Sequence, residues 1–143
     1  MREKRILILE DELLQALDLS EFLTKDGYIT RIVDHFEQAI EAMGEFDPHL
    51  IMCDINLKHN KTGIDFAHAA NLLKPNVSII FITAVTKLAT ITEAQETDPL
   101  NYIVKPWKEE QVKVTIQMAF NYIISKQKSQ ISLDKITNVV LHW

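Results

Sequence analysis

Short apolar runs of strand length alternate with longer amphipathic segments along this 143-residue chain. The runs are rich in Ile, Leu and Val, and several end abruptly at a charged or hydroxyl residue. This is the pattern of strands that are buried on both faces of a parallel sheet. The expected strands are residues 5–9, 28–33, 50–53, 78–82 and 101–104.

The segments between these runs carry apolar residues at helical spacing. In the first of them Leu13, Ala16, Leu19 and Leu23 fall on one stripe, and Gly27 supplies a helix stop of the usual kind. Prolines end two later segments, because the residue before a proline is pushed out of the helical region. The later helices are expected at residues 36–46, 64–73, 87–96 and 109–125.

Strands that alternate with helices favour parallel pairing through right-handed crossovers, which lay helices on both faces of one sheet. The expected fold class is therefore α/β, with a five-stranded parallel sheet sandwiched by five helices. An apolar content of 47% is enough for one core. We expect residues 1–125 to form a single domain.

Residues 126–143 are expected to be a linker and a short amphipathic tail. The run Ser125 to Gln130 is polar, and it is followed by four apolar residues at heptad-like spacing, Leu133, Ile136, Val140 and Trp143. Such a tail cannot bury its apolar side chains alone. Three uses stay open: it docks on the domain, it pairs with its copy in a dimer, or it is the stub of an effector region.

Charge and composition exclude some partners. The chain has 15 Lys+Arg against 20 Asp+Glu, and no basic stripe, so direct nucleic acid binding by this segment is not expected. No run of about 18 apolar residues is present to span a membrane, and the N-terminus lacks a signal-peptide region. The one cysteine, Cys53, excludes an internal disulfide and is expected to be small core filler. The cytoplasm is the expected location.

Chemically active side chains come directly after the strands. Glu10 and Asp11 come after the first expected strand, Asp54 after the third, Thr83 after the fourth and Lys105 after the fifth. The carboxyl ends of parallel strands meet at one edge. Three carboxylates there would repel one another unless a hard cation such as Mg²⁺ neutralised them. A carboxylate nucleophile beside Mg²⁺, a lysine and a hydroxyl indicates a phosphoryl-accepting site. Taken alone, the first two acids would be only a helix N-terminus favoured by the dipole.

Over residues 4–125 the sequence resembles the receiver domain of bacterial two-component response regulators. The resemblance rests on the five residues above, each at a strand end and in the family's order. It implies a flavodoxin-like receiver fold with strand order 2-1-3-4-5, which we take from the resemblance and not from periodicity.

The resemblance also implies roles for these residues. Asp54 looks like the phosphoacceptor, which takes a phosphoryl group from a sensor histidine kinase or a phosphotransfer protein. Asp11, Asp54 and the backbone carbonyl of Asn56 would bind Mg²⁺ directly, and Glu10 would act mostly through water. Lys105 would hold a phosphoryl oxygen, and its bond to the next residue, a proline, is expected to be cis.

Thr83 and Tyr102 match the family's switch pair. The resemblance implies that the threonine hydroxyl is drawn toward the phosphoryl group and that the aromatic ring turns inward behind it. Signalling would then arise from a shift between two states of the surface formed by the last two helices and the last strand. The chain is not expected to be an enzyme of metabolism; it would catalyse only its own Mg²⁺-dependent phosphorylation and dephosphorylation.

The sequence departs from the family's pattern at three positions. Glu10 stands where aspartate is commoner, and Trp107 stands where phenylalanine is more usual after Lys-Pro. Val85, two residues after Thr83, cannot orient an attacking water as a polar residue does. We therefore expect a relatively long-lived acyl phosphate.

The last helix has more apolar side chains than its core-facing stripe needs. Val114, Met118 and Tyr122 lie on a different face from its core stripe. We expect this face to contact a downstream effector or a second copy of the chain; the alternative is that a neighbouring loop partly covers it.

Three other functions compete with the signalling switch. A phosphatase with an aspartate nucleophile would carry a second acid two residues later, where this chain has Asn56. A flavin carrier would need a phosphate-binding loop after the first strand, and Glu10 with Asp11 would repel the anion. A receiver-like docking module that is not phosphorylated is the alternative that stays open.

Overall fold

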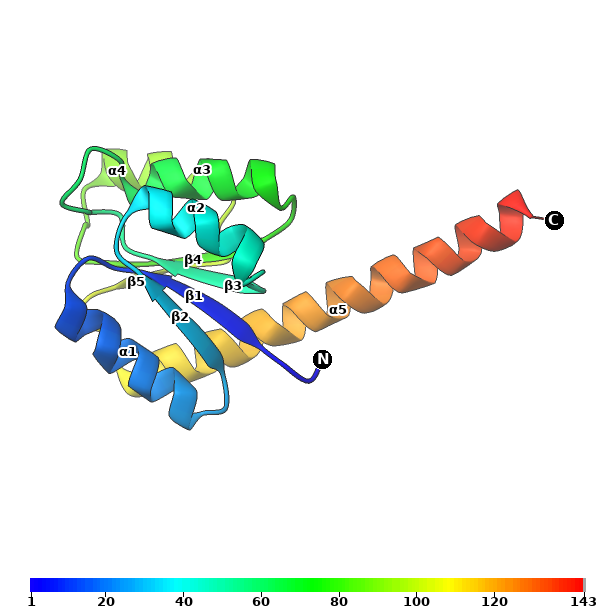
Figure 1. Ribbon diagram of the computed structural model, residues 1–143, viewed down its shortest axis with the longest axis horizontal. Helices are drawn as coiled ribbons and strands as arrows, with labels where there is room; N and C mark the ends of the chain where they lie inside the picture. Colours follow the sequence, from blue (N-terminus) through cyan, green and yellow to red (C-terminus); the bar gives the residue numbers. More distant parts are fainter. Residues whose placement is uncertain (143) are drawn as a thin grey trace.

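The computed structural model, which describes residues 1–142, is a five-stranded parallel sheet with helices on both faces (Figure 1). The strand order is β2-β1-β3-β4-β5, so the expected fold and strand order are confirmed. The elements in chain order are β1 (Arg5–Leu9), α1 (Leu13–Lys25), β2 (Ile29–Val33), α2 (Phe36–Glu45), β3 (Leu50–Cys53), α3 (Gly63–Leu73), β4 (Ser78–Thr83), α4 (Leu88–Gln95), β5 (Asn101–Val104) and α5 (Glu109–Leu141).

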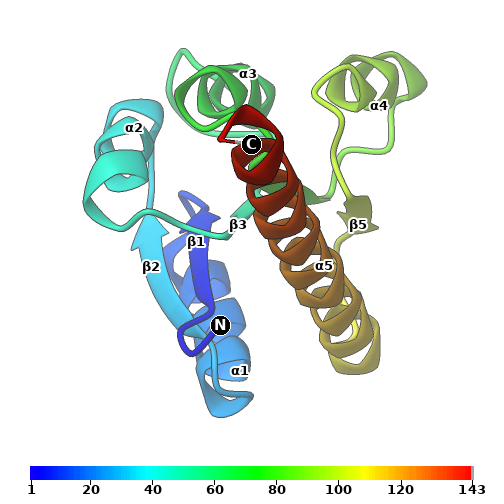
Figure 2. The same ribbon diagram turned by 90° about the vertical axis from the view of Figure 1, so that its right-hand side faces the viewer.

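The central strand β3 divides the core into two halves. All four of its residues are fully buried, and they alternate between the two faces of the sheet. Ile51 and Cys53 face a cluster built with α2, α3 and α4, while Leu50 and Met52 face a cluster built with α1 and α5. Figure 2 shows the same grouping, with α2, α3 and α4 on one side of the sheet and α1 and α5 on the other. This double burial explains why the sequence of β3 is continuously apolar.

Local signals set several element boundaries. Gly27 has a φ of +93°, the left-handed conformation that lets the chain turn after α1 into β2. At the start of α3, Thr62 Oγ1 accepts from the backbone N–H of Asp65, whose carboxylate accepts from the N–H of Thr62. This capping box fixes the N-terminus of α3, the helix that comes after the loop at the end of β3.

The C-terminal helix is longer than expected. It runs without a break from Glu109 to Leu141, 33 residues, so the predicted helix end near residue 125 is wrong and the polar run 125–130 is helical. The physical reason is that this run consists of Ser, Lys and Gln, without the Gly or Pro that would stop a helix. The second half of α5 projects away from the sheet (Figure 1). Trp143, the last residue of the expected tail, lies outside the described residues.

Despite its length, α5 does not have the apolar composition of a membrane span. Among residues 1–142, no helix is both long enough and apolar enough to cross a bilayer.

Candidate functional site at the carboxyl edge of the sheet

The structure brings the expected residues to one edge of the sheet. β1 and β3 are neighbours, with Leu9 beside Cys53, so the acids that come after the two strands lie side by side. β4 and β5 are also paired, with Thr83 beside Val104, which places Lys105 across from the end of β4. The backbone N–H of Lys105 donates to the carbonyl of Thr83 at 2.9 Å. The edge therefore gathers residues that are far apart in sequence.

The ammonium of Lys105 lies at the centre of this edge. Its Nζ donates to Asp54 Oδ2 at 2.8 Å and also contacts Glu10 Oε1. Both acids are 6% exposed, so the two carboxylates and the lysine form a largely buried ionic cluster. A third acceptor, Gln15 Oε1 on α1, lies 2.6 Å from the same nitrogen. The bond from Lys105 to Pro106 is cis, as expected.

Burial and charge shift the protonation of this cluster. Burial alone lowers the pKa of Lys105, but hydrogen bonds to Asp54 and Glu10 outweigh it and leave the pKa raised. Burial raises the pKa of Glu10, and the charge of Asp54 adds to the rise, while the hydrogen bond from Lys105 opposes it. The lysine is thus firmly held as a cation between two carboxylates that repel each other.

The backbone around Asp54 is tightly fixed. Its N–H donates to the carbonyl of Leu9 at 2.9 Å, and its Oδ1 accepts from the N–H of Asn56 at 3.2 Å. Gly63 passes so close that a Cβ there would lie 2.0 Å from the carbonyl oxygen of Asp54. The need for glycine at this position depends on a tertiary approach that the local sequence does not show.

Asp11 and Lys58 close the outer side of the edge. Asp11 Oδ2 accepts from the backbone N–H of Lys58 at 2.5 Å, and the Lys58 ammonium pairs with Glu12 at 3.2 Å. Lys58 and Gln15 are contacts that the sequence analysis missed. For Gln15 a signal was present, because it lies in the first turn of α1, directly after the two acids that come at the end of β1.

The chemistry of the residues at this edge suits a magnesium ion. Glu10, Asp11 and Asp54 would offer carboxylate oxygens and Asn56 a backbone carbonyl, which are the hard ligands that Mg²⁺ takes. Glu10 and Asp54 already share contact with the Lys105 ammonium, so both reach a common cation. In the part of the chain that the structure describes, however, no three acidic, His or Cys side chains are grouped closely enough to form a metal site by themselves. Such an ion would complete its shell with water.

Thr83 and Tyr102 both contact the loop after β4. Thr83 is fully buried, and its Oγ1 accepts from the N–H of Val85 at 3.4 Å. The hydroxyl of Tyr102 donates to the carbonyl of Val85 at 2.7 Å, and its ring lies 6.1 Å from that of Phe81. The side chain of Tyr102 is partly buried against the core, and both residues hydrogen-bond to the backbone of Val85.

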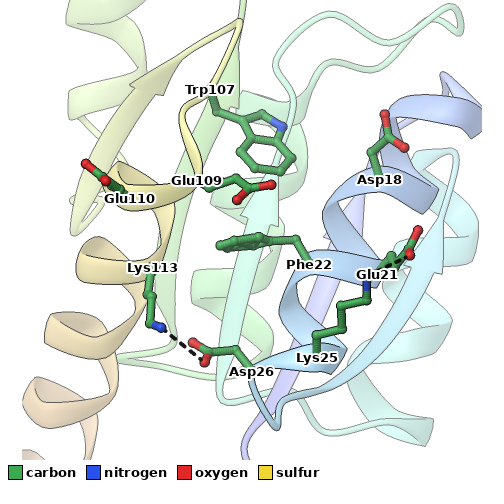
Figure 3. A pocket seen from close by; sticks show the side chains of 9 residues that line it. All are labelled: Asp18, Glu21, Phe22, Lys25, Asp26, Trp107, Glu109, Glu110 and Lys113. Atoms are coloured by element: carbon green, nitrogen blue, oxygen red, sulfur yellow. Dashed lines mark ion pairs between the residues drawn. The ribbon is translucent and has the colours of Figure 1, made fainter.

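Trp107 lies away from this edge, beside a cavity of about 660 Å³ between α1 and the start of α5 (Figure 3). Its indole packs edge-on against Phe22, with ring centroids 5.4 Å apart. Acidic residues rim the cavity, and two of them, Glu21 and Asp26, pair with lysines. None of the residues described at the carboxyl edge of the sheet lines it. Trp107 thus packs the junction of two helices.

Comparisons with known sequences all match one family. The model of the response regulator receiver domain matches residues 6–117. The luminescence regulatory protein LuxO of Vibrio campbellii is 32% identical over 112 residues, which are 78% of this chain and 24% of LuxO. The sensory transduction protein LytT of Bacillus subtilis is 31% identical over 115 residues, 79% of this chain and 46% of LytT. The chain therefore spans about a quarter to a half of the length of these relatives.

Solved structures show the same fold. A CheY-like receiver domain protein from Methanospirillum hungatei superposes with a TM-score of 0.82 at 21% identity, covering 87% of this chain and 98% of that one. The receiver domain of a modulated diguanylate cyclase from Desulfovibrio desulfuricans gives 0.77 at 28% identity, with 87% and 98% covered. With the fold, the edge residues and the family model in agreement, the chain belongs to the response regulator receiver domain family.

Proposed function

We propose that the chain is a phosphorylation-dependent signalling switch that accepts a phosphoryl group on Asp54 from a sensor histidine kinase or a phosphotransfer protein. The observation that carries this proposal is the ionic cluster at the carboxyl edge. Asp54 is held 2.8 Å from Lys105 and beside Glu10, on a backbone fixed by neighbouring strands. A buried carboxylate can act as a nucleophile, and a cation beside it can bind the negatively charged phosphoryl group that it attacks.

The proposed reaction is a displacement at phosphorus. A carboxylate oxygen of Asp54 attacks the phosphoryl group of the donor's phosphohistidine, the P–N bond breaks, and its electron pair leaves with the imidazole. Lys105 then binds a phosphoryl oxygen, since its ammonium already contacts the attacking carboxylate. Glu10, Asp11, Asp54 and the carbonyl of Asn56 would hold Mg²⁺, which when bound supplies positive charge against the carboxylates and the phosphoryl group.

The signal would leave the site through the loop after β4. Thr83 and Tyr102 both bond to Val85, so movement of the Thr83 hydroxyl toward a phosphoryl oxygen releases one of the two bonds that hold this loop. The loop leads into α4, and Tyr102 lies on β5. The consequence would be a population shift of the surface formed by α4, β5 and α5. A downstream effector or a second copy would read this surface, and the cytoplasm is the proposed setting.

Val85 bears on how long the signal lasts. Its side chain is half-buried against the core and has no group that can orient an attacking water. We expect Val85→Gln to lose its phosphoryl group several-fold faster than the parent chain, measured as the decay of phosphorylated mass after the donor is removed. Val85→Ile is the matched apolar control and should decay at the parent rate. An unchanged rate in Val85→Gln would refute the role of this side chain.

The phosphoacceptor is tested by intact mass after incubation with acetyl phosphate or phosphoramidate, with Mg²⁺ or with EDTA. We expect a gain of about 80 Da, one phosphoryl group, that needs Mg²⁺. It should disappear in Asp54→Asn and persist in Asp98→Asn, an equally conservative change at an exposed turn. No gain with either donor would instead support a docking module that is not phosphorylated.

A further inference from the structure

Two histidines that are far apart in sequence meet in space. His35 comes between β2 and α2, and His59 lies in the loop between β3 and α3. Their ring centroids are 5.6 Å apart, and the rings meet edge to face at an angle of 66°. Both residues line a cavity of about 320 Å³ that neither Asp54 nor Lys105 lines. This pair of imidazoles therefore has no part in the phosphoryl chemistry described above.

A carboxylate orients the first of the two rings. His35 Nδ1 lies 2.6 Å from Asp34 Oδ1, and an ionised carboxylate can only accept, so this ring nitrogen carries the proton. In the neutral ring the other nitrogen, Nε2, then keeps its lone pair for a ligand. Histidines that bind metal ions in proteins almost always donate their second ring N–H in this way. His35 therefore has the tautomer that a metal-binding histidine needs.

The separation of the rings suits one shared ion. With metal–nitrogen bonds of about 2 Å, two imidazoles on one tetrahedral ion have ring centroids roughly 5 Å apart. The observed 5.6 Å needs only a small rotation of His59, which is exposed in its loop. Within residues 1–142 no third His, Cys or acidic side chain joins such a pair closely enough to complete a metal site. Water would therefore supply the remaining ligands of the ion.

The charges around the two rings are compatible with a cation. Two lysines also line the cavity, but the Lys58 ammonium pairs with Glu12 at 3.2 Å, and the Lys61 ammonium lies 5.3 Å from the centroid of the Phe36 ring. Both ammonium groups thus have partners of their own. The carboxylate of Glu37, in the first turn of α2 and on the wall of the same cavity, offsets their charge.

We propose that His35 and His59 bind a transition-metal dication of the zinc class, and that Asp34 is the positioning residue that orients His35. Imidazole suits Zn²⁺, Ni²⁺ and Cu²⁺, whereas Mg²⁺ prefers carboxylate and carbonyl oxygens. This site is therefore chemically distinct from the magnesium site proposed at the carboxyl edge. An ion bound here ties the loop after β2 to the loop after β3, the loop that begins with Asp54.

The test is a calorimetric titration of the full chain with Zn²⁺ in the presence of excess Mg²⁺, which occupies the carboxyl edge. We expect one Zn²⁺ per chain. His35→Gln and His59→Gln should each weaken binding at least about tenfold, and Asp34→Asn about tenfold, since loss of a ligand or of its orienting carboxylate has effects of this size. His68→Gln is the matched control, because His68 is exposed on α3 and does not line the cavity.

Two further measurements separate metal binding from a general effect on the fold. Zn²⁺ should slow amide hydrogen exchange in residues 34–37 and 57–61 together in the parent chain, and in neither segment of His59→Gln. The ¹⁵N chemical shifts of His35 report its tautomer without any metal. They should show a proton on Nδ1 in the parent chain and lose this preference in Asp34→Asn, which a purely structural role of Asp34 would not change.

The outcome does not depend on phosphorylation. Asp54→Asn should bind Zn²⁺ like the parent chain, so failure of the proposed function would leave this result intact. A parent chain that binds no Zn²⁺, equal weakening by His68→Gln and His59→Gln, or protection of only one of the two loops would each overturn the proposal.

Discussion

At the residue scale, Lys105 balances two buried acids. Its ammonium is the cation shared by Asp54 and Glu10, and its side chain is 16% exposed. In Lys105→Met both carboxylates stay buried with their counter-ion removed, so we expect the free energy of unfolding at pH 7 to fall by about 3 kcal/mol. Urea denaturation measures the change. Adding Asp54→Asn to this variant should restore part of the loss, and a double variant no more stable than the single one would contradict the account.

His49 makes stability depend on pH. Its Nδ1 accepts from the backbone N–H of Arg5 at 3.0 Å, and burial, together with the smaller effects of the charges of Arg5 and Lys74, lowers its pKa. The unfolded chain therefore binds a proton more readily than the folded chain does. This contribution to stability is present above the ordinary value of 6.5 and is lost as the pH falls through the lowered pKa.

The substitution His49→Gln keeps a hydrogen-bond acceptor and removes the titration. We expect its free energy of unfolding to fall less than that of the parent chain between pH 7 and pH 5. Urea titrations at several pH values compare the two slopes. Parallel curves would show that another group controls stability in this range.

At the element scale, the start of α3 packs against the end of β3, where Asp54 lies. A Cβ on Gly63 would lie 2.0 Å from the Asp54 carbonyl oxygen and 2.7 Å from Cys53 Sγ. We expect Gly63→Ala to cost about 2 kcal/mol of unfolding free energy, since backbone must move. It should also slow phosphorylation by acetyl phosphate, because the loop carries Asp54.

The control lies in a neighbouring helix. Gly44, near the end of α2, has nothing within 4 Å of an added Cβ, so Gly44→Ala should raise the unfolding free energy by about 0.5 to 1 kcal/mol. Thermal melts of the two variants compare them directly. Equal effects of the two alanines would rule out the close approach of Gly63 as the cause.

At the scale of the whole molecule, metal binding at the edge should stabilise the fold. An ion that binds only the folded chain adds about 1.4 kcal/mol when its concentration is ten times its Kd. We expect Mg²⁺ to raise the Tm of the parent chain above its value in EDTA. The shift should shrink in Asp11→Asn and persist in Asp98→Asn. Equal shifts in the three proteins would place the ion elsewhere.

The sequence by itself determined the layered α/β fold and the residues at the strand ends. Apolar runs such as Leu50–Cys53 are long enough only for strands, and parallel strands bring the residues after their carboxyl ends to one edge. The sequence could therefore identify Glu10, Asp11, Asp54 and Lys105 from their positions directly after the strands and from the chemistry of their side chains. These signals are local, so they can be read without knowledge of the tertiary structure.

Only the tertiary structure decided which groups touch. The contact of Gln15 with Lys105 joins side chains 90 positions apart, and the approach of Gly63 to Asp54 depends on how a loop folds over β3. The end of α5 was misjudged for a related reason. A polar run looks alike in a linker and in a solvent-exposed helix, because its residues have no core to face in either case. Helical continuity there comes from the absence of a stop signal.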